Sequence, residues 1–372
     1  MAKICIGITG ENGFLGTHLR NHLKFRYKDF NHIPFERNYF DNQEQLDGFV
    51  SKCDIIVHLA GLNRNSSPSK IYSTNLHISH QLANALLLNE FKGQLIFSSS
   101  LHENQNSPYG KSKKESHQLF IDAAEKGNFS FVGLVMPNIY GPFCKPNYNS
   151  FITTFCHNLI NSKQSQINDN PVSLIFVDSV VDIIVEQFNQ KGIQSILVPP
   201  FIKTTVTEVW ELLCKFKASY FDFGEIPELN SEFELSLFNT FRSVINPQAF
   251  FPREYIKHED NRGYFTEIIR ESCGGQVSFS VTKPGITRGN HFHTRKIERF
   301  SVIQGEAEIA IRKIGTSEIV KFKLTGEKPE YIDIPIWYTH KITNIRNEDL
   351  VTIFWINEHY NEDKTDVYEE KV

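Results

Sequence analysis

The first 137 residues alternate short apolar segments with amphipathic helical patterns, and this alternation restricts the possible folds more than any other feature. Four aliphatic segments have the length of buried strands: residues 3–9, 53–61, 93–100 and 129–137. Three segments repeat apolar side chains at helical spacing: residues 14–25, 79–91 and 113–126. Apolar strands separated by helices are typical of a parallel sheet that is covered on both faces. We therefore predict an α/β fold with a doubly wound, Rossmann-type sheet.

The pattern changes in the rest of the chain. Residues 151–245 contain four helical patterns, which we interpret as a cap or connector. From about residue 247 onward, short alternating segments are separated by Gly, Pro and Asn, which is typical of an all-β sandwich or barrel. A chain of 372 residues is long enough for two or three domains. We predict two, with residues 1–245 as the α/β domain and residues 246–372 as the β domain.

The composition argues against several kinds of partner. The formal net charge is −4, so no overall basic field favours nucleic acid. No apolar segment approaches the roughly 20 residues that span a bilayer, and residues 1–10 have the pattern of a first strand, not of a signal peptide. The six cysteines form no C-x-x-C pair, which favours a reducing compartment. We expect a cytoplasmic protein that binds neither nucleic acid nor membrane.

Three glycines, Gly10, Gly13 and Gly16, lie between the first predicted strand and the first predicted helix. Glycine allows a tight turn and a close approach of the backbone to a pyrophosphate, and the helix N-terminus adds N–H donors. About twenty residues later come Glu36 and Arg37. An acidic side chain there favours ribose hydroxyls, and an arginine favours a 2′-phosphate. The pattern predicts dinucleotide binding, and Arg37 favours NADPH; the alternative is that both charges are solvated loop residues.

Tyr109 and Lys113 are four residues apart at the start of a predicted helix, so their side chains share one face. We expect the Lys113 ammonium to lower the pKa of the Tyr109 phenol, which can then exchange a proton with a carbonyl or alcohol oxygen. Residues 98–100 are serines that end the preceding strand, at the edge where α/β sheets bind ligands. A Tyr–Lys pair alone is common on helix surfaces, but together with the glycines and serines it predicts a catalytic site.

Residues 1 to about 245 resemble the extended short-chain dehydrogenase/reductases that act on nucleotide sugars. The resemblance rests on five motifs: TGENGFLG (9–16), HLAG (58–61), FSSS (97–100), SPYGKSK (107–113) and PNIYGP (137–142). It implies that Tyr109 is the general acid and Lys113 its partner. It also implies that Ser100 holds the substrate carbonyl, with Ser98 and Ser99 as alternatives. The family often has a longer segment between this serine and the tyrosine than this chain has.

The same resemblance implies which residues bind the ligands. Those expected to bind NADPH are Gly10, Gly13, Phe14, Leu15, Gly16, Arg37, Leu59, Ala60, Gly61, Tyr109 and Lys113. Those expected to bind the substrate are Asn138 and Asn149.

A second group of functional side chains lies in the predicted β domain. His291 and His293 are two residues apart, so on a strand they project to the same face. Glu298 follows a turn, and His340 lies in the segment IPIWYTHKITN. Three imidazoles and a carboxylate suit Zn²⁺ or another borderline divalent ion. A single histidine on a strand is more often a hydrogen-bonded core residue, but the four residues together predict a metal site.

Residues 255–372 resemble the cupin barrels, whose first motif is G-x5-H-x-H-x4-E-x6-G. This chain matches that motif from Gly285 to Gly305. The second motif departs at Trp337, where the family usually has glycine. The resemblance implies an all-β cupin barrel in which His291, His293, Glu298 and His340 hold the metal.

The whole chain is similar to the CapF-type bifunctional enzymes of capsular polysaccharide synthesis. This resemblance implies a UDP-linked 4-keto-6-deoxy-N-acetylhexosamine as substrate. The cupin would invert C3, with Tyr338 or Lys296 as candidate bases, and the reductase domain would then reduce the C4 ketone with NADPH. The product would be a UDP-2-acetamido-2,6-dideoxy-L-talose, on the route to UDP-N-acetyl-L-fucosamine. A homodimer is the expected assembly.

Three alternatives remain at this point. The chain could be a single-activity reductase whose cupin only dimerises or senses a ligand. It could also be a non-catalytic dinucleotide-binding regulator, although Tyr109 and Lys113 argue against this. A metal-free epimerase cupin is the third, but such a site has little need of three histidines and a glutamate.

Overall fold

The computed structural model describes residues 3–27, 29–148 and 150–372, and it divides into two compact units. The first unit comprises residues 1–154 and 167–209, and the second comprises residues 155–166 and 210–372. The units therefore differ from the predicted domains in the assignment of residues 155–166 and 210–245. The boundary after residue 245 stays a prediction.

Residues 210–245 group with the second unit because they bond directly to its strands. The Asn239 amide donates to the Arg295 carbonyl at 2.8 Å, and the Arg242 guanidinium donates to the Ile334 carbonyl at 2.9 Å. The buried Arg299 guanidinium in turn donates to the Gly224 carbonyl at 2.8 Å. These bonds satisfy buried polar groups, so the helices are part of the same packed body.

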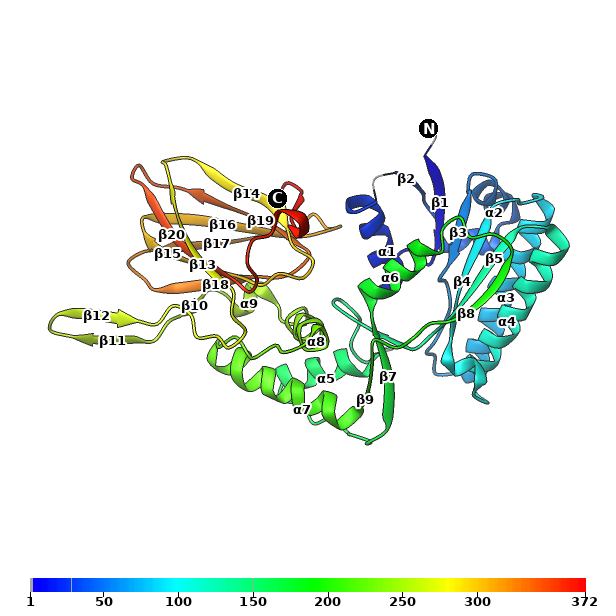
Figure 1. The fold of residues 1–372 in the computed structure, drawn as a ribbon, viewed down its shortest axis with the longest axis horizontal. Coiled ribbons are helices and arrows are strands. Elements are labelled where there is room, and N and C mark those ends of the chain that lie inside the picture. The colour runs from blue at the N-terminus through cyan, green and yellow to red at the C-terminus, as the bar shows by residue number, and fades with distance from the viewer. Residues whose placement is uncertain (1–2, 28, 149) are drawn as a thin grey trace. The chain divides into compact units, whose positions relative to one another are not determined.

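The first unit is built on a six-stranded parallel sheet, with strand order β2-β1-β3-β4-β5-β8 (Figure 1). Its strands are β1 (Ile4–Thr9), β2 (Phe30–Ile33), β3 (Ile55–His58), β4 (Gln94–Ser100), β5 (Ser130–Met136) and β8 (Ile193–Leu197). The strand order reverses between β1 and β3, and ligands of open α/β sheets bind at the carboxyl ends of the strands beside such a switch point. The predicted Rossmann-type sheet is thus confirmed.

Helices cover both faces of this sheet, as its apolar strands require. Helices α1 (Phe14–Phe25) and α6 (Val177–Glu186) pack on one face through aliphatic side chains such as Leu19 and Val181. Helices α2 (Gln43–Val50), α3 (Pro68–Leu88) and α4 (Pro108–Gly127) pack on the other face. Helix α3 begins earlier than the predicted residue 79 because Pro68, whose fixed φ suits a first helical turn, starts it.

The remaining elements of the first unit form an outlying layer beside the sheet. Strands β6 (Asn138–Tyr140), β7 (Pro171–Phe176) and β9 (Ile202–Thr205) make a three-stranded sheet. Two short 3-10 helices, η1 (Arg37–Asp41) and η2 (Leu101–Asn104), follow strand ends. Helix α5 (Phe151–Ile160) spans the division between the units.

The second unit contains two five-stranded antiparallel sheets, which confirms the predicted β-rich part. One has the order β10-β18-β15-β20-β13, with β10 (Arg253–Glu254), β13 (Gln276–Thr282), β15 (Glu298–Gln304), β18 (Glu330–Ile334) and β20 (Leu350–Ile356). The other has the order β17-β16-β19-β14-β21, with β14 (Thr287–Phe292), β16 (Glu306–Lys313), β17 (Ile319–Thr325), β19 (Tyr338–Asn344) and β21 (Tyr368–Glu369). Side chains from both sheets, including Ile309, Ile332 and Leu350, form one apolar core between them.

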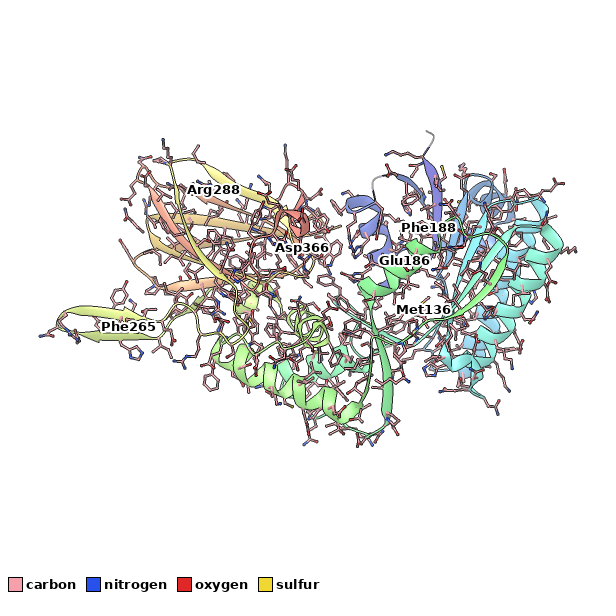
Figure 2. The ribbon with its side chains drawn as sticks, in the orientation of Figure 1. Met136, Glu186, Phe188, Phe265, Arg288 and Asp366 are labelled. Carbon is pink, nitrogen blue, oxygen red and sulfur yellow. The ribbon has the colours of Figure 1, made fainter. Side chains whose placement is uncertain are left out.

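Helices and a hairpin complete the second unit. The helices are α7 (Val206–Phe216), a π-helical turn η3 (Lys217–Asp222), α8 (Glu232–Arg242), α9 (Pro247–Phe250) and the 3-10 turn η4 (Glu362–Lys364). Strands β11 (Lys257–Asp260) and β12 (Gly263–Thr266) form a separate hairpin that carries the exposed Phe265 (Figure 2). Over the described residues, no helix combines the length and the apolar character needed to cross a bilayer.

Candidate functional site

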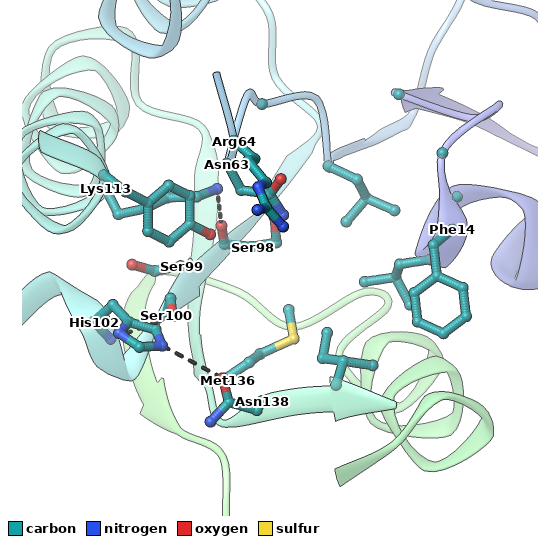
Figure 3. A pocket seen from close by; sticks show the side chains of 18 of the residues that line it. Phe14, Asn63, Arg64, Ser98, Ser99, Ser100, His102, Lys113, Met136 and Asn138 are labelled. Atoms are coloured by element: carbon teal, nitrogen blue, oxygen red, sulfur yellow. Dashed lines mark hydrogen bonds between the residues drawn. The ribbon is translucent and has the colours of Figure 1, made fainter. Parts of the chain in front are cut away.

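A cavity of about 560 Å³ opens at the carboxyl ends of the parallel strands in the first unit (Figure 3). Most of the predicted cofactor and catalytic residues line it: Gly10, Gly13, Phe14, Leu15, Gly16, Leu59, Gly61, Ser100, Tyr109 and Lys113. Asn138, the predicted substrate residue on β6, also lines it. Asn149 lies outside the described residues. The structure thus brings together side chains that span more than a hundred positions of sequence.

The glycine turn is built for close backbone approach. Gly10 has a φ of 76°, in the left-handed region that glycine tolerates best. A Cβ at Gly10 would lie 2.8 Å from the Ala60 nitrogen, and a Cβ at Gly16 would collide with the Gly10 carbonyl oxygen. The turn leads directly into α1, whose N-cap Gly13 is extended and leaves the first N–H groups of the helix open. This cradle fits a dinucleotide pyrophosphate.

Two of the predicted cofactor residues are not among the described residues that line the cavity. Ala60 packs behind the turn, where its N–H donates to the Thr9 hydroxyl at 3.3 Å. Arg37 is exposed at the start of η1. Between them lies Glu11, a buried carboxylate that accepts from the Phe35 N–H at 3.1 Å. The role of Arg37 in choosing NADPH stays a prediction.

The three strand-end serines have different partners. Ser98 donates to the His58 carbonyl at 3.3 Å, and Ser99 donates to the Glu103 carboxylate. Ser100 accepts from the His102 N–H at 3.2 Å and also hydrogen-bonds the Tyr109 hydroxyl. Of the three, Ser100 is therefore the one whose hydroxyl lies beside the phenol, as its predicted role requires.

The prediction that Lys113 lowers the pKa of Tyr109 is wrong. Burial raises the pKa of Tyr109 to about 12, and the hydrogen bond with Ser100 only partly opposes it. Burial also lowers the pKa of Lys113 to about 8. The Lys113 ammonium donates to the Ser98 carbonyl at 2.6 Å and lies 6.0 Å from the centroid of the Tyr109 ring, so it does not stabilise a phenolate directly. Tyr109 is consequently a phenol at neutral pH, the form of a proton donor.

Several further residues that line the cavity were missed by the sequence analysis, among them the polar side chains of Asn63, Arg64 and His102. In Figure 3, His102 points toward Asn138, and its Nε2 lies 3.4 Å from the Asn138 Oδ1. Its carbonyl packs so closely on α4 that a Cβ at Gly110 would collide with it. The sequence contained one signal for His102, the short segment between Ser100 and Tyr109. So short a segment keeps η2 beside the cavity.

In the second unit, His291, His293, Glu298 and His340 converge as predicted. One ligand atom from each lies within 4.8 Å of all the others. The Glu298 Oε2 is 3.0 Å from the His293 Nε2 and 3.4 Å from the His340 Nε2. Bonds of about 2.0–2.2 Å to a tetrahedral ion place ligand atoms roughly 3.2–3.5 Å apart, so the donor set fits Zn²⁺ or a similar cation.

The electrostatics of this cluster also suit a cation. Burial lowers the pKa of His291 and lowers that of His340 to about 3. Burial would raise the pKa of Glu298, but the neighbouring imidazoles, His293 foremost, lower it to about 2. His291 and His340 are thus held neutral and the carboxylate ionised, which are the protonation states in which these groups bind a metal. Burial would lower the pKa of His293, but Glu298 outweighs it and raises that pKa, so this imidazole would release its proton when a cation binds.

Trp337 occupies the position where the cupin pattern usually has glycine. Its φ of 60° is in the left-handed region, which explains the usual preference. The buried indole stacks on Phe292 with ring centroids 5.4 Å apart. The backbone N–H of Trp337 donates to the His293 carbonyl at 2.7 Å. These contacts therefore stabilise the left-handed conformation that glycine would otherwise supply at this turn. His340, three residues later, joins the cluster.

Both candidate bases lie in this region. Lys296 is only 3 % exposed, and its charge adds to the effect of burial in lowering the pKa of His291. Tyr338 and His340 occupy alternate positions of β19, so their side chains share one face of the sheet. Burial raises the pKa of Tyr338. Each stays a candidate.

A second group of metal-ligand types, His18, His22 and Asp178, joins α1 to α6. The His22 Nε2 lies 3.1 Å and the His18 Nδ1 3.5 Å from the Asp178 Oδ1. The Arg26 guanidinium faces the His22 Nδ1 at 3.1 Å, and because guanidinium only donates, that nitrogen must accept. The other ring nitrogen of His22, Nε2, therefore carries a proton and donates it toward Asp178. We interpret the group as a hydrogen-bonded clasp between helices.

The family comparisons agree with the two units. Residues 6–193 match the model of the NAD dependent epimerase/dehydratase family, and residues 258–368 match the polysaccharide biosynthesis C-terminal domain.

Individual relatives extend this likeness to the whole chain. A UDP-2-acetamido-2,6-beta-L-arabino-hexul-4-ose reductase of Pseudomonas aeruginosa is 32% identical over 365 residues, 97% of either chain. The solved capsular polysaccharide assembling protein CapF of Staphylococcus aureus is 35% identical, with a TM-score of 0.60 over 99% of this chain and 100% of its own. The structure of RMD from P. aeruginosa with NADPH is 19% identical, with a TM-score of 0.53 over 58% of this chain and 84% of its own, a likeness of fold alone.

Proposed function

Because this chain belongs to the CapF-like family, in which an epimerase/dehydratase domain precedes a polysaccharide biosynthesis C-terminal domain, we propose that it is a bifunctional nucleotide-sugar enzyme. Its substrate is a UDP-2-acetamido-2,6-dideoxy-4-keto-hexose. The C-terminal site epimerises C3, and the N-terminal site then reduces the C4 ketone with NADPH. The product is UDP-2-acetamido-2,6-dideoxy-L-talose, on the route to UDP-N-acetyl-L-fucosamine for capsule or O-antigen.

The observation that carries this proposal is the presence of two separate electrophile-activating centres in one chain. One is the half-buried Ser100–Tyr109 pair at the carboxyl ends of the parallel strands. The other is the group of three imidazoles and one carboxylate in the β-rich unit. A ketone reductase needs only the first.

At the first centre, the chain itself supplies the proton and the positioning. The glycine cradle would hold NADPH, which would supply the hydride for C4. Tyr109, which is a phenol at neutral pH, gives its proton to the C4 oxygen, so that the ketone becomes a hydroxyl. Ser100 holds the same oxygen, and Lys113 fixes the strand end through the Ser98 carbonyl. His102 and Asn138, which also line the cavity, contact the sugar.

At the second centre, the four ligands would hold a divalent cation. Such a cation would supply Lewis acidity toward the 4-keto group, beside which the C3 proton is removable. Tyr338 or Lys296 takes that proton, and a proton returns to the other face of C3. Epimerisation comes first, because the C4 ketone that acidifies C3 is lost on reduction. We also propose that the enzyme is a cytoplasmic homodimer.

The test separates the two centres. Tyr109→Phe should lower NADPH oxidation by about 10²–10⁴-fold, the usual size of acid catalysis, and keep deuterium uptake at C3 from heavy water. His291→Ala should lose the uptake but still reduce a ketone that is already epimerised. His359→Ala, which changes an exposed histidine, is the control. NMR of the products reads both activities.

Loss of both activities in each of the two variants would refute the division of labour. The second candidate is a single-activity reductase with a structural or ligand-sensing cupin. It predicts no C3 exchange in wild-type protein when NADPH is withheld, whatever the metal content. The departure of Trp337 from the cupin pattern is the one feature that favours it.

A further inference from the structure

The last residues of the chain lie against the strand that carries the first metal ligand. Strand β21 pairs with β14, with His291 opposite Glu369 and Phe292 opposite Tyr368. The Tyr368 ring stacks on Phe292 at 5.2 Å between centroids, and the Glu370 N–H donates to the Asn290 carbonyl at 3.0 Å. Residues 365–372, here called the C-terminal strap, are therefore anchored beside the proposed metal site.

Within the strap, Asp366 holds the turn between two metal ligands. Its side chain is completely buried, and its carboxylate accepts from the backbone N–H groups of Thr294 at 3.1 Å, Arg295 at 3.0 Å and Lys296 at 3.2 Å. It also accepts from the Thr294 hydroxyl at 2.6 Å. A carboxylate in a nest of this kind fixes the backbone that surrounds it. The turn it fixes runs from His293 to Glu298, and it also bears Lys296, one of the two candidate bases.

The backbone of Asp366 acts on His293 directly. The His293 Nδ1 lies 2.6 Å from the Asp366 carbonyl oxygen, which can only accept. Nδ1 therefore carries a proton, and Nε2 faces the Glu298 carboxylate, 3.0 Å away. Metal-ligating histidines usually have such a partner on the second nitrogen, which sets the tautomer and the ring orientation.

Asp366 makes these contacts from an unfavourable backbone conformation. Its φ is 45°, in the left-handed region, which is unfavourable for a non-glycine residue. Such a conformation persists only where the surrounding contacts impose it. Here those contacts are the hydrogen bonds between Asp366 and the turn that carries the metal ligands.

From this geometry we propose that Asp366 is a positioning residue, and that the C-terminal strap sets the affinity of the second unit for a divalent cation. The inference rests on the metal site of the proposed function, but not on epimerase activity. Partners of this kind typically contribute 10–100-fold to metal affinity. Asp366→Ala should therefore weaken binding by about 10–100-fold although all four ligands remain.

The experiment measures Zn²⁺ affinity of the full chain by competition with a chromophoric chelator, and the d–d spectrum of the Co²⁺ form. The variants are Asp366→Ala, the milder Asp366→Asn, and Thr294→Val, which removes only the hydroxyl bond. Asp363→Asn is the matched control, because it removes the same charge from an exposed position nearby in sequence. The calorimetric unfolding transition of the second unit, which contains all of these positions, confirms that each variant is folded.

We expect the Asp366 variants to bind Zn²⁺ 10–100-fold more weakly and to shift the Co²⁺ spectrum, Thr294→Val to lose severalfold, and Asp363→Asn to match wild type. Equal affinity and an unchanged spectrum in wild type and Asp366→Ala would overturn the inference. Wild-type protein that binds no metal would instead overturn the metal site itself, so the two failures are distinguishable. If Asp366→Ala does not fold, the Zn²⁺ affinity and Co²⁺ spectrum of Thr294→Val and Asp366→Asn test the inference in its place.

Discussion

At the scale of single residues, the protonation state of Tyr109 agrees with the direction of the proposed reaction. A reductase needs a proton donor, and burial raises the pKa of this phenol to about 12. An alcohol dehydrogenase would need the phenolate instead. The lowered pKa of Lys113 has the same cause, because burial disfavours an ammonium as it disfavours a phenolate.

The clasp of Asp178 with His18 and His22 gives a prediction on pH. Burial would raise the pKa of Asp178, but His22 and His18 outweigh it and hold that pKa well below the ordinary value. A carboxylate with a depressed folded-state pKa stabilises the fold above its unfolded pKa of about 4, and the stabilisation is lost as pH falls below that value. Asp178→Asn should therefore lower the free energy of unfolding by about 3 kcal/mol at pH 7.

Denaturant unfolding of wild type and variant between pH 7 and pH 3 checks this. The difference should be constant down to about pH 5 and shrink below about pH 4. Asp182→Asn on the same helix is the control, because its ion pair with Arg26 is partly exposed and screened. A difference that grows as the solution is acidified would contradict the assignment.

At the scale of elements, the active cavity depends on how closely η2 packs on the start of α4. Ser100 and His102 reach the cavity from β4 and η2, and Tyr109 reaches it from α4. The close approach is possible because Gly110 has no Cβ. The register between the two elements, and with it the Ser100–Tyr109 distance, therefore depends on one glycine.

Gly110→Ala should displace η2 and lower kcat/KM for the ketone by at least tenfold, with an effect on the sugar KM because His102 moves as well. Gly48→Ala is a matched control in α2, since nothing lies within 4 Å of its added Cβ. This control should gain about 0.5–1 kcal/mol of stability and keep full activity. Steady-state kinetics and thermal unfolding measure both, and an active Gly110→Ala would show that η2 is not a fixed wall.

At the scale of the whole molecule, the two compact units have separate cores and separate candidate centres. Ligands of one unit should therefore stabilise that unit. The four metal ligands all belong to the second unit, and the dinucleotide cradle belongs to the first. The chain is then expected to unfold in more than one step.

Removal of metal provides the corresponding prediction. A strong chelator should lower the melting temperature of one calorimetric transition by several degrees and leave NADPH binding unchanged. The transition of the double variant His291→Ala, His293→Ala should not respond to the chelator. A chelator effect of equal size in that variant would place the bound metal elsewhere.

Much of the candidate site was predictable because its signals are local. The glycine turn, the Tyr109–Lys113 spacing and the His291–His293 pair each lie within a few residues, and their chemistry follows from residue type. Arg37 shows the limit of such reasoning, since it is exposed at the start of η1 although its sequence position suits a 2′-phosphate. Its role still depends on a cofactor test.

By itself, the sequence determined the doubly wound sheet, the β-rich second part and the types of side chain available for chemistry, because hydrophobic period and glycine placement act over short stretches. Only the tertiary structure decided which serine meets Tyr109 and in which direction its pKa moves, because burial is a property of the packed unit. It also brought Asp366 to His293, 73 positions earlier. No local pattern encodes that contact, which exists only once β21 pairs with β14.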